Sequence, residues 1–355
     1  MVALETPGAL LDLGVSKPVF DCRWPLTRER TEALWASRPH ALYDQPYLGG
    51  QDDLHETVTA RWRAWAAPVV AVPDAFRFHY ATQGSTEAIR ESLALHAIAS
   101  RASGREPVIH VFHGEYEGYA AEMEGYGGRV VRHDRDDYED SFTREARAGD
   151  RVYLSQPSAI DGNVWTGYDA FIAFLEARHP ELRVVVDLTY VGTVARDHRI
   201  AVGSPAIDVV VASLSKVMGI YYHRVGFAFA RAPLAGLYGN RWFKNTFSLA
   251  LASDLLERTG NPYVLPRLHE PAQQEIVREL AARTRLAVVA SDAVLLATSP
   301  AAEAGVSDDL RVLARGAPGR ERLRFCLTPA FDARFAAAAG AASRGSSPRP
   351  VGEHR

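Results

Sequence analysis

The chain has 355 residues with 40 basic and 43 acidic side chains, so its formal net charge is only −3. This balance argues against a nucleic-acid or acidic-membrane binder, and two cysteines are too few for a disulfide framework or a cysteine metal cluster. No apolar run reaches the roughly eighteen residues of a membrane helix, and the N-terminus lacks the basic region of a secretory signal, so we expect a cytoplasmic, metal-free protein.

The first fifty residues form a separate N-terminal arm, predicted for residues 1–50. A helix is expected near Thr27–Ser37, and the turn-rich segment YDQPYLGG follows it. A large domain is predicted for residues 51–231.

Short β-rich runs alternate with helical stretches between about residues 82 and 230. The runs VVVD and DVVVAS are continuously apolar, which is typical of strands covered on both faces. This alternation predicts a three-layer α/β/α sandwich with a mostly parallel sheet, which binds ligands beyond the carboxyl ends of its strands. The predicted strands are Pro107–Phe112, Arg151–Ser155, Arg183–Asp187, Asp208–Ser213 and Gly226–Ala230, and the helices include Thr86–Ser100 and Tyr168–Arg178.

The pattern changes after residue 232 to longer helices with two late strands. This change predicts a smaller α+β domain over residues 232–336, and the small, polar composition of residues 337–355 predicts a disordered tail. The expected elements are helices Leu249–Arg258 and Gln273–Ala287 and strands Ala287–Val289 and Arg322–Leu327.

Lysine is scarce, and one of the three lysines lies just past the end of an apolar strand. In VVVASLSKVMGIYYHRVGF, Lys216 is flanked by Ser213 and Ser215 and is followed eight residues later by Arg224. An amine at a sheet's carboxyl edge, close to an arginine, suits a Schiff base beside a bound anion. The plainer alternative is a surface lysine in a loop.

SLSK followed by RVGF resembles the [ST]-x-[SA]-K segment of the fold-type I pyridoxal-phosphate enzymes, in the aspartate-aminotransferase-like class I and II branch, where an arginine follows the lysine by eight positions. The resemblance implies that Lys216 forms a Schiff base with pyridoxal 5′-phosphate and moves the substrate Cα proton. It also implies that Arg224 binds the cofactor phosphate together with a hydroxyl of Ser213 or Ser215. The position in the motif favours Ser213.

Other segments resemble the same family in the expected order. VVVDLTYVG is similar to its D-x-x-Y element, which implies that Asp187 holds the pyridine nitrogen and Tyr190 the phenolic oxygen. ATQGSTEAIRESL enters a helix, a weak signal alone, and the resemblance implies a phosphate cradle of Gly84, Ser85 and Thr86.

The segment HVFHGEYEGYAAE resembles the family's P-x-Y-x-x-Y without its proline. The resemblance implies that Tyr116 stacks on the cofactor with Tyr119 behind it, whereas a surface tyrosine pair is the alternative.

One family element departs from the usual pattern. The turn that usually carries an asparagine donor to the phenolic oxygen reads SQPSAIDGNVWTG, and Ala159 takes the asparagine's place. Either Asn163 replaces it or Tyr190 acts alone, and the loss of this donor opens reaction types other than transamination.

Substrate contacts are expected from both ends of the chain. In ERLRFCLTP, Arg324 takes the place of the family's carboxylate-binding arginine, with Arg322 as the alternative. The segment YDQPYLGGQDDLHETVTARW resembles the family's N-terminal arm, which implies that Tyr43, or alternatively Tyr47, reaches the cofactor phosphate of the partner subunit. The preceding FDCRWP takes the place where the family approaches the substrate, so Arg23 and Trp24 are candidates for substrate binding.

The resemblance is greatest to histidinol-phosphate-aminotransferase-like members. It implies a homodimeric aminotransferase of amino-acid metabolism or biosynthesis, whose substrates are an α-amino acid or related amine and a 2-oxo acid. The alternatives are elimination, replacement, cyclisation or oxidation with the same cofactor, and a cofactor-binding regulator, which usually has a fused DNA-binding domain. The sequence does not identify the amino acid.

Overall fold

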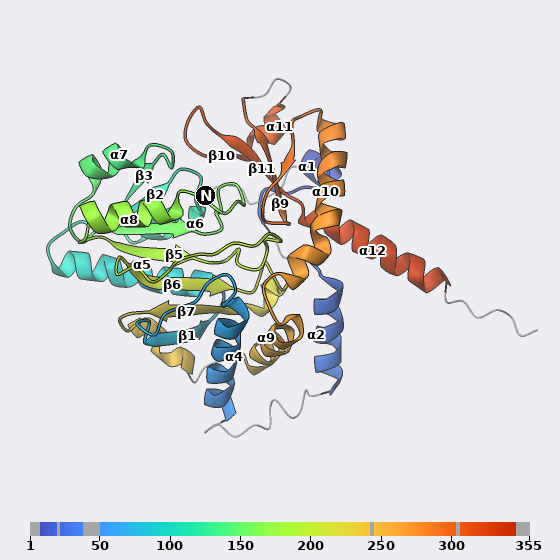
Figure 1. Ribbon diagram of the computed structural model, residues 1–355, viewed down its shortest axis with the longest axis horizontal. Coiled ribbons are helices and arrows are strands. Elements are labelled where there is room, and N and C mark those ends of the chain that lie inside the picture. Colours follow the sequence, from blue (N-terminus) through green and yellow to red (C-terminus); the bar gives the residue numbers. More distant parts are fainter. Residues whose placement is uncertain (1–7, 20–21, 38–49, 242–244, 303–305, 346–355) are drawn as a thin grey trace, which may run out of the picture.

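The computed structural model describes residues 8–19, 22–37, 50–241, 245–302 and 306–345. Within these ranges the chain builds a seven-stranded sheet with helices on both faces and a four-stranded sheet beside it (Figure 1). The predicted α/β/α sandwich with a smaller α+β part is therefore confirmed. In the part of the chain described, no helix is both long and apolar enough to cross a bilayer.

The large sheet has the strand order β1-β7-β6-β5-β4-β2-β3. Only β7 runs antiparallel to its neighbours β1 and β6, and the other neighbouring strands are parallel. The strands are β1 (Phe78–Thr82), β2 (Val108–Phe112), β3 (Arg129–His133), β4 (Arg151–Ser155), β5 (Arg183–Asp187), β6 (Ile207–Ser213) and β7 (Gly226–Ala230).

Alternate side chains of the central strands pack against different helix layers. Val184 and Val186 of β5 belong to a core cluster with α4, α7 and α8, whereas Val185 belongs to a second cluster with α5 and α6. Because neighbouring residues of a strand point to opposite faces, both faces of β5 must be apolar. The layer helices are α4 (Gly50–Ala66), α5 (Ser85–Ala102), α6 (Glu117–Gly125), α7 (Tyr138–Glu145) and α8 (Tyr168–Arg178).

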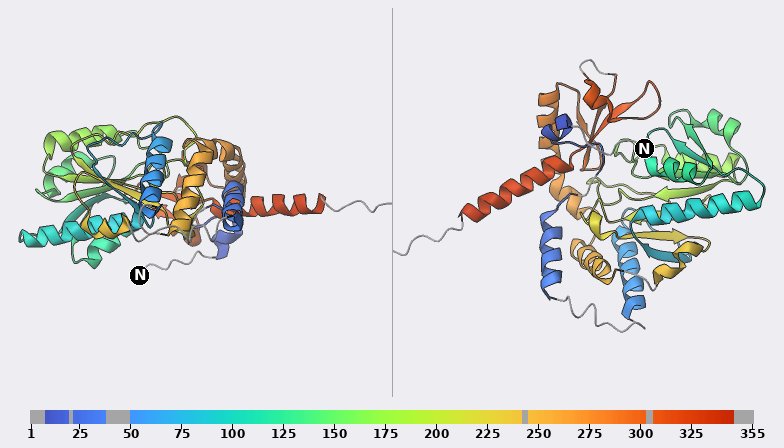
Figure 2. Two further views of the ribbon diagram at one scale, coloured as in Figure 1. Left: turned by 90° about the horizontal axis from the view of Figure 1, so that it is seen from below. Right: turned by 180° about the vertical axis from the view of Figure 1, so that it is seen from behind.

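The small sheet is antiparallel in the order β10-β11-β9-β8, and the N-terminal segment joins it through a bridge between Ser16 and Cys326. Figures 1 and 2 show it next to α10 and α11. Its elements are β8 (Val289–Ala290), β9 (Leu296–Pro300), β10 (Ala314–Arg315) and β11 (Arg322–Cys326), with α1 (Gly8–Asp12), α10 (Val264–Thr284) and α11 (Asp308–Arg311).

One helix that the sequence assigned to the small domain packs elsewhere. Helix α9 (Thr246–Thr259) lies against α4 and α2 (Pro25–Ser37), beside the large sheet (Figure 1). The side chains of Leu251 and Leu255 are buried there, and Asp254 pairs with Arg30 of α2 at 2.8 Å. The chain therefore stays with the helices beside the large sheet beyond residue 232, where the composition changes.

The C-terminal segment is helical further than predicted. Helix α12 (Thr328–Gly345) continues past Ala337, where the sequence favoured a disordered tail. A run of alanines, the residue with the highest helix propensity, accounts for the difference. Figure 2 shows α12 projecting away from the two sheets.

Candidate active site

A cavity of about 290 Å³ lies between the carboxyl ends of the large sheet's strands and the small sheet. Its walls come from the ends of β4, β5 and β6, the start of α5, and strands β10 and β11. Ten of the predicted site residues line it: Ser85, Thr86, Tyr116, Asp187, Tyr190, Ser213, Ser215, Lys216, Arg224 and Arg324.

Lys216 stands in the turn that follows β6. The backbone N–H of Leu214 donates to Val225 at 3.0 Å, and that of Met218 donates to Leu214, so the turn is held at both ends. The Lys216 side chain is half-buried, and its Nζ lies 5.5 Å from the centroid of the Tyr221 ring. The amine therefore faces the cavity from a rigid support at the sheet's edge.

One end of the cavity concentrates positive charge. Arg224 donates through Nη2 to the Gln83 carbonyl at 3.1 Å and to Thr86 Oγ1 at 3.5 Å, which places its guanidinium over the N-terminus of α5. Gly84 has φ +74°, and a Cβ there would lie 2.7 Å from Arg224 Nη2. A guanidinium beside the positive end of a helix suits an anionic ligand group.

Two serine hydroxyls lie in the same lining. Ser213 Oγ is 3.0 Å from Ser215 Oγ and accepts the Ser215 backbone N–H at 3.2 Å. Both side chains are buried yet line the cavity, so they can turn hydroxyls towards an anion beside Arg224.

Asp187 provides a buried carboxylate at the end of β5. Its Oδ1 accepts the Thr189 backbone N–H at 2.9 Å, and its Oδ2 accepts the Tyr119 hydroxyl at 2.9 Å. Burial raises the pKa of Asp187, while the hydrogen bonds from Thr189 and Tyr119 oppose the rise. Such a carboxylate suits a ligand nitrogen that carries a proton.

The two tyrosines of the GEYEGY segment have different positions. Tyr116, at the start of α6, lines the cavity, and its ring meets that of Tyr119 edge to face at 5.4 Å. Tyr119 is fully buried and holds Asp187, so it is not a surface tyrosine. Tyr190 is buried as well, and burial raises its pKa to about 12.

Arg324 comes to the opposite wall from β11. Its guanidinium donates to the Ala159 carbonyl and, at 3.4 Å, to the Lys17 carbonyl, but its buried Nε has no hydrogen-bond partner among the described residues. An orphaned buried donor beside a cavity is what a ligand carboxylate would satisfy. The alternative Arg322 donates to Thr298 instead and does not line the cavity.

Sequence reasoning missed a second arginine on this wall. Arg315 of β10 lines the cavity and donates to Glu117 Oε1 at 3.0 Å. Burial and the nearby Arg324 guanidinium lower the pKa of Arg315 to about 10. The two-residue strand β10 has no periodic pattern that could have identified it. Lys17, Ser155, Thr189 and Tyr221 are further cavity residues that were not predicted.

Several predicted residues do not reach the cavity. Asn163 accepts the Asp292 backbone N–H at 2.9 Å, so it does not replace the donor lost at Ala159, which does line the cavity. Arg23 is exposed and pairs with Asp332. Trp24 is buried against His269, a core position. Tyr43 lies outside the described residues.

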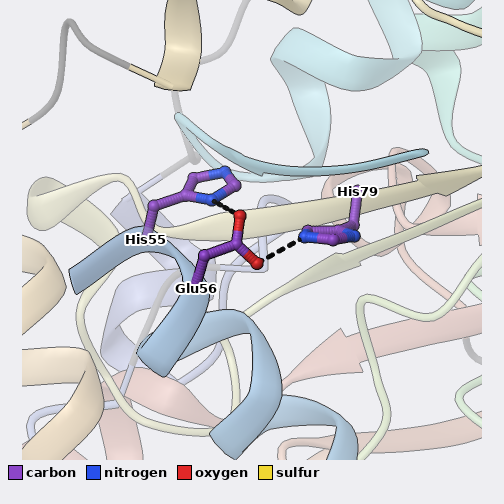
Figure 3. A group of neighbouring side chains, drawn as sticks. All are labelled: His55, Glu56 and His79. Atoms are coloured by element: carbon purple, nitrogen blue, oxygen red, sulfur yellow. Dashed lines mark hydrogen bonds and ion pairs between the residues drawn. The ribbon is translucent and has the colours of Figure 1, made fainter. Parts of the chain in front are cut away.

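Among the described residues, one group has the residue types of a metal site: His55 and Glu56 of α4 with His79 of β1 (Figure 3). His55 Nε2 accepts the Ala81 backbone N–H at 3.0 Å, so Nδ1 carries the ring's proton and donates to Glu56 at 3.3 Å. The other Glu56 oxygen lies 2.8 Å from His79 Nε2. A protonated Nδ1 has no lone pair for a cation, so this group is a hydrogen-bonded chain.

The sequence profile of the family described as aminotransferase class I and II matches residues 93–311. The matched range contains Tyr116, Asp187, Lys216 and Arg224, and it ends before Arg324. No curated protein matches the chain in sequence.

The fold is similar to solved aminotransferase structures. YbdL from Escherichia coli, a methionine aminotransferase, has a TM-score of 0.67 and 18% identity over 93% of this chain and 96% of that one. Histidinol-phosphate aminotransferase from Sinorhizobium meliloti, in complex with pyridoxal 5′-phosphate, has a TM-score of 0.66 and 15% identity, over 95% of this chain and 98% of that one. An aromatic aminotransferase from Pyrococcus horikoshii has a TM-score of 0.64 and 16% identity, over 92% of this chain and 96% of that one. At these identities the likeness establishes the fold.

Proposed function

This chain belongs to the class I and II aminotransferase family and is thus a fold-type I, pyridoxal-phosphate-dependent aminotransferase, and we propose that Lys216 carries its cofactor. The substrates we propose are an α-amino acid or related amine and a 2-oxo acid. The observation that carries the proposal is a single cavity in which an amine, a buried carboxylate and an anion cradle face one another.

The cavity residues fit this cofactor. The cradle of Gly84, Ser85, Thr86 and Arg224, with a hydroxyl of Ser213 or Ser215, would hold the phosphate. Gly84 supports this role, because its φ of +74° favours glycine and its backbone lies close to the Arg224 guanidinium. Asp187 would hold the ring nitrogen, whose proton would offset the cost of a buried carboxylate.

The bound cofactor supplies an aldehyde carbon that accepts the amino group and a ring that withdraws electrons. Lys216 Nζ would take the proton from the substrate Cα as general base and, as general acid, deliver it to the cofactor carbon that has accepted the amino group; the same two steps in reverse would serve the 2-oxo acid acceptor. Asp187 would keep the ring nitrogen protonated, Tyr116 would stack on the ring, and Tyr190 would donate to its phenolic oxygen.

The substrate carboxylate is assigned to Arg324 on the strength of its unpartnered Nε. We expect Arg324→Met to raise the KM for the amino acid by roughly 30- to 1000-fold, because two charge-assisted hydrogen bonds of about 1–2 kcal/mol each are lost. The cofactor's dissociation constant should not change. Initial rates and cofactor titration measure the two effects, and an unchanged KM would assign the carboxylate to another residue. Arg322→Met is the matched control on the same strand.

Arg315 supports a dicarboxylic 2-oxo acid as the amino acceptor. Two guanidiniums on one wall repel each other, and a second carboxylate of the ligand would relieve this repulsion. We expect Arg315→Met to raise the KM for 2-oxoglutarate about tenfold, the effect of roughly 1.4 kcal/mol, and to leave that for pyruvate nearly unchanged. Equal effects on the two acids would contradict this role.

We further propose a cytoplasmic homodimer that acts in amino-acid or specialised biosynthesis, with Tyr43 reaching the partner's cofactor phosphate. Tyr222 is 81% exposed and lines a second cavity together with Arg224. So large an exposed aromatic ring beside the site supports a dimer in which a second copy of the chain buries it. Sedimentation equilibrium tests the dimer.

The reaction is tested with purified protein loaded with pyridoxal 5′-phosphate and offered single amino acids. Conversion of the cofactor to its pyridoxamine form, and its reversal by 2-oxoglutarate, would support amino transfer. Release of ammonia or uptake of dioxygen without any 2-oxo acid would contradict it and favour the elimination or oxidation alternatives.

A further inference from the structure

A buried carboxyl group lies behind the cavity wall and has no role in the proposed mechanism. Glu115 is in the turn between β2 and α6, directly before Tyr116, and is only 6% exposed. The turn packs closely against the segment that follows β10, since a Cβ at Gly114, which has φ +85°, would lie 2.5 Å from the Gly316 backbone nitrogen. Glu115 does not line the cavity, so it can act only through its neighbours.

Both carboxyl oxygens of Glu115 contact Ser155, which does line the cavity. Oε1 accepts the Ser155 backbone N–H at 3.2 Å, and Oε2 lies 2.6 Å from Ser155 Oγ. Ser155 Oγ also accepts the backbone N–H of Ala159 at 2.6 Å. Ser155 is paired in register with Asp187 on the neighbouring strand, so its hydroxyl borders the place where the ring would bind.

The hydroxyl of Ser155 has one proton and two lone pairs, and one lone pair is taken by Ala159. If Glu115 is ionised, the Ser155 proton points to Glu115 and the cavity receives only a lone pair. If Glu115 is protonated, it donates to Ser155, whose own proton is then released towards the cavity. The proton of Glu115 thus decides whether Ser155 is a donor or an acceptor there.

The groups that face Glu115 keep this choice open. Arg135 favours its ionised form, whereas Asp187, from β5, opposes it, and the buried Tyr119 lies close by. Burial is the largest influence and raises the pKa of Glu115 to about 7.

We propose that Glu115 is a positioning residue that turns the Ser155 hydroxyl into a hydrogen-bond donor towards the cofactor, in place of the amide that Ala159 lacks. This inference rests on the proposed function, because it requires the cofactor in this cavity. The donor is present while Glu115 holds its proton and is lost when Glu115 ionises.

The test follows the absorption and fluorescence of enzyme loaded with pyridoxamine 5′-phosphate from about pH 5 to about pH 9. This form has no covalent link to Lys216, so the titration of the lysine does not contribute. We expect a spectral transition near pH 7 in the unmodified enzyme. Glu115→Gln should abolish it and keep the low-pH spectrum, because the glutamine amide donates permanently to Ser155. Ser155→Ala should abolish it and keep the high-pH spectrum.

Glu124→Gln, an exposed carboxyl change on α6, is the control and should keep the transition. A transition that persists in either Glu115→Gln or Ser155→Ala, or its absence from the unmodified enzyme, would overturn the inference. Failure of the protein to bind either form of the cofactor would instead overturn the proposed function. Thermal unfolding shows which variants are folded, and either variant alone decides the result.

Discussion

Lys216→Ala is expected to abolish the visible absorption of the enzyme-bound cofactor and reduce amino transfer by at least about 10²- to 10⁴-fold. That factor is the usual contribution of general acid–base catalysis alone, and the covalent attachment of the cofactor is lost in addition. A neighbouring arginine cannot form the Schiff base in place of Lys216, because its guanidinium does not lose its proton. Absorption spectra and initial rates at saturating cofactor measure the two effects.

Lys17 provides the control for this result. It also lines the cavity, but next to Arg324 on the wall of the small sheet. Lys17→Met should therefore keep the absorption. If Lys17→Met removes the absorption and Lys216→Ala does not, the lysine that carries the cofactor has been misassigned.

Asp187→Asn is expected to lower the rate by about 10²- to 10⁴-fold and to weaken cofactor binding. Removing one partner of a buried ion pair costs about 3–5 kcal/mol, and each 1.4 kcal/mol corresponds to a factor of ten. An amide also cannot keep the ring nitrogen protonated. Cofactor titration and single-turnover rates would measure the loss, with the exposed Asp169→Asn as control.

The pH dependence of cofactor binding gives a second measure of Asp187. Burial raises its pKa, so in the free enzyme this carboxylate takes up a proton at a higher pH than an exposed aspartate. Cofactor affinity should therefore fall as the pH drops through this raised pKa. The fall should disappear in Asp187→Asn, and an identical fall in both proteins would assign it to another group.

The central strands of the large sheet could be predicted closely because they are buried on both faces. Strands β4, β5 and β7 have the predicted bounds, and β2 and β6 differ by one residue. Strands β1 and β3 lie at the two edges of the sheet and were not predicted, and only the last residue of β3 is buried. Helix α8 also has its predicted bounds, whereas α10 begins nine residues earlier, at Val264.

The site residues that follow strand ends were predictable for a related reason. Asp187 and Lys216 stand at or just after the carboxyl ends of β5 and β6, which parallel pairing places at one edge of the sheet. Ser155 ends β4 at the same edge and could have been found by the same reasoning. The prediction that Arg23 and Trp24 line the cavity was wrong, because nothing in their own segment shows how it packs relative to the cavity.

The sequence by itself thus determined the layered fold, the family resemblance and the lysine at the sheet's edge, because short apolar runs and local motifs express them. Only the tertiary structure decided which distant groups meet: Arg315 beside Arg324, Tyr119 on Asp187, and Glu115 behind Ser155. These contacts join residues between 9 and 68 positions apart. They depend on how one sheet packs against its helices and against the other sheet, which no local pattern encodes.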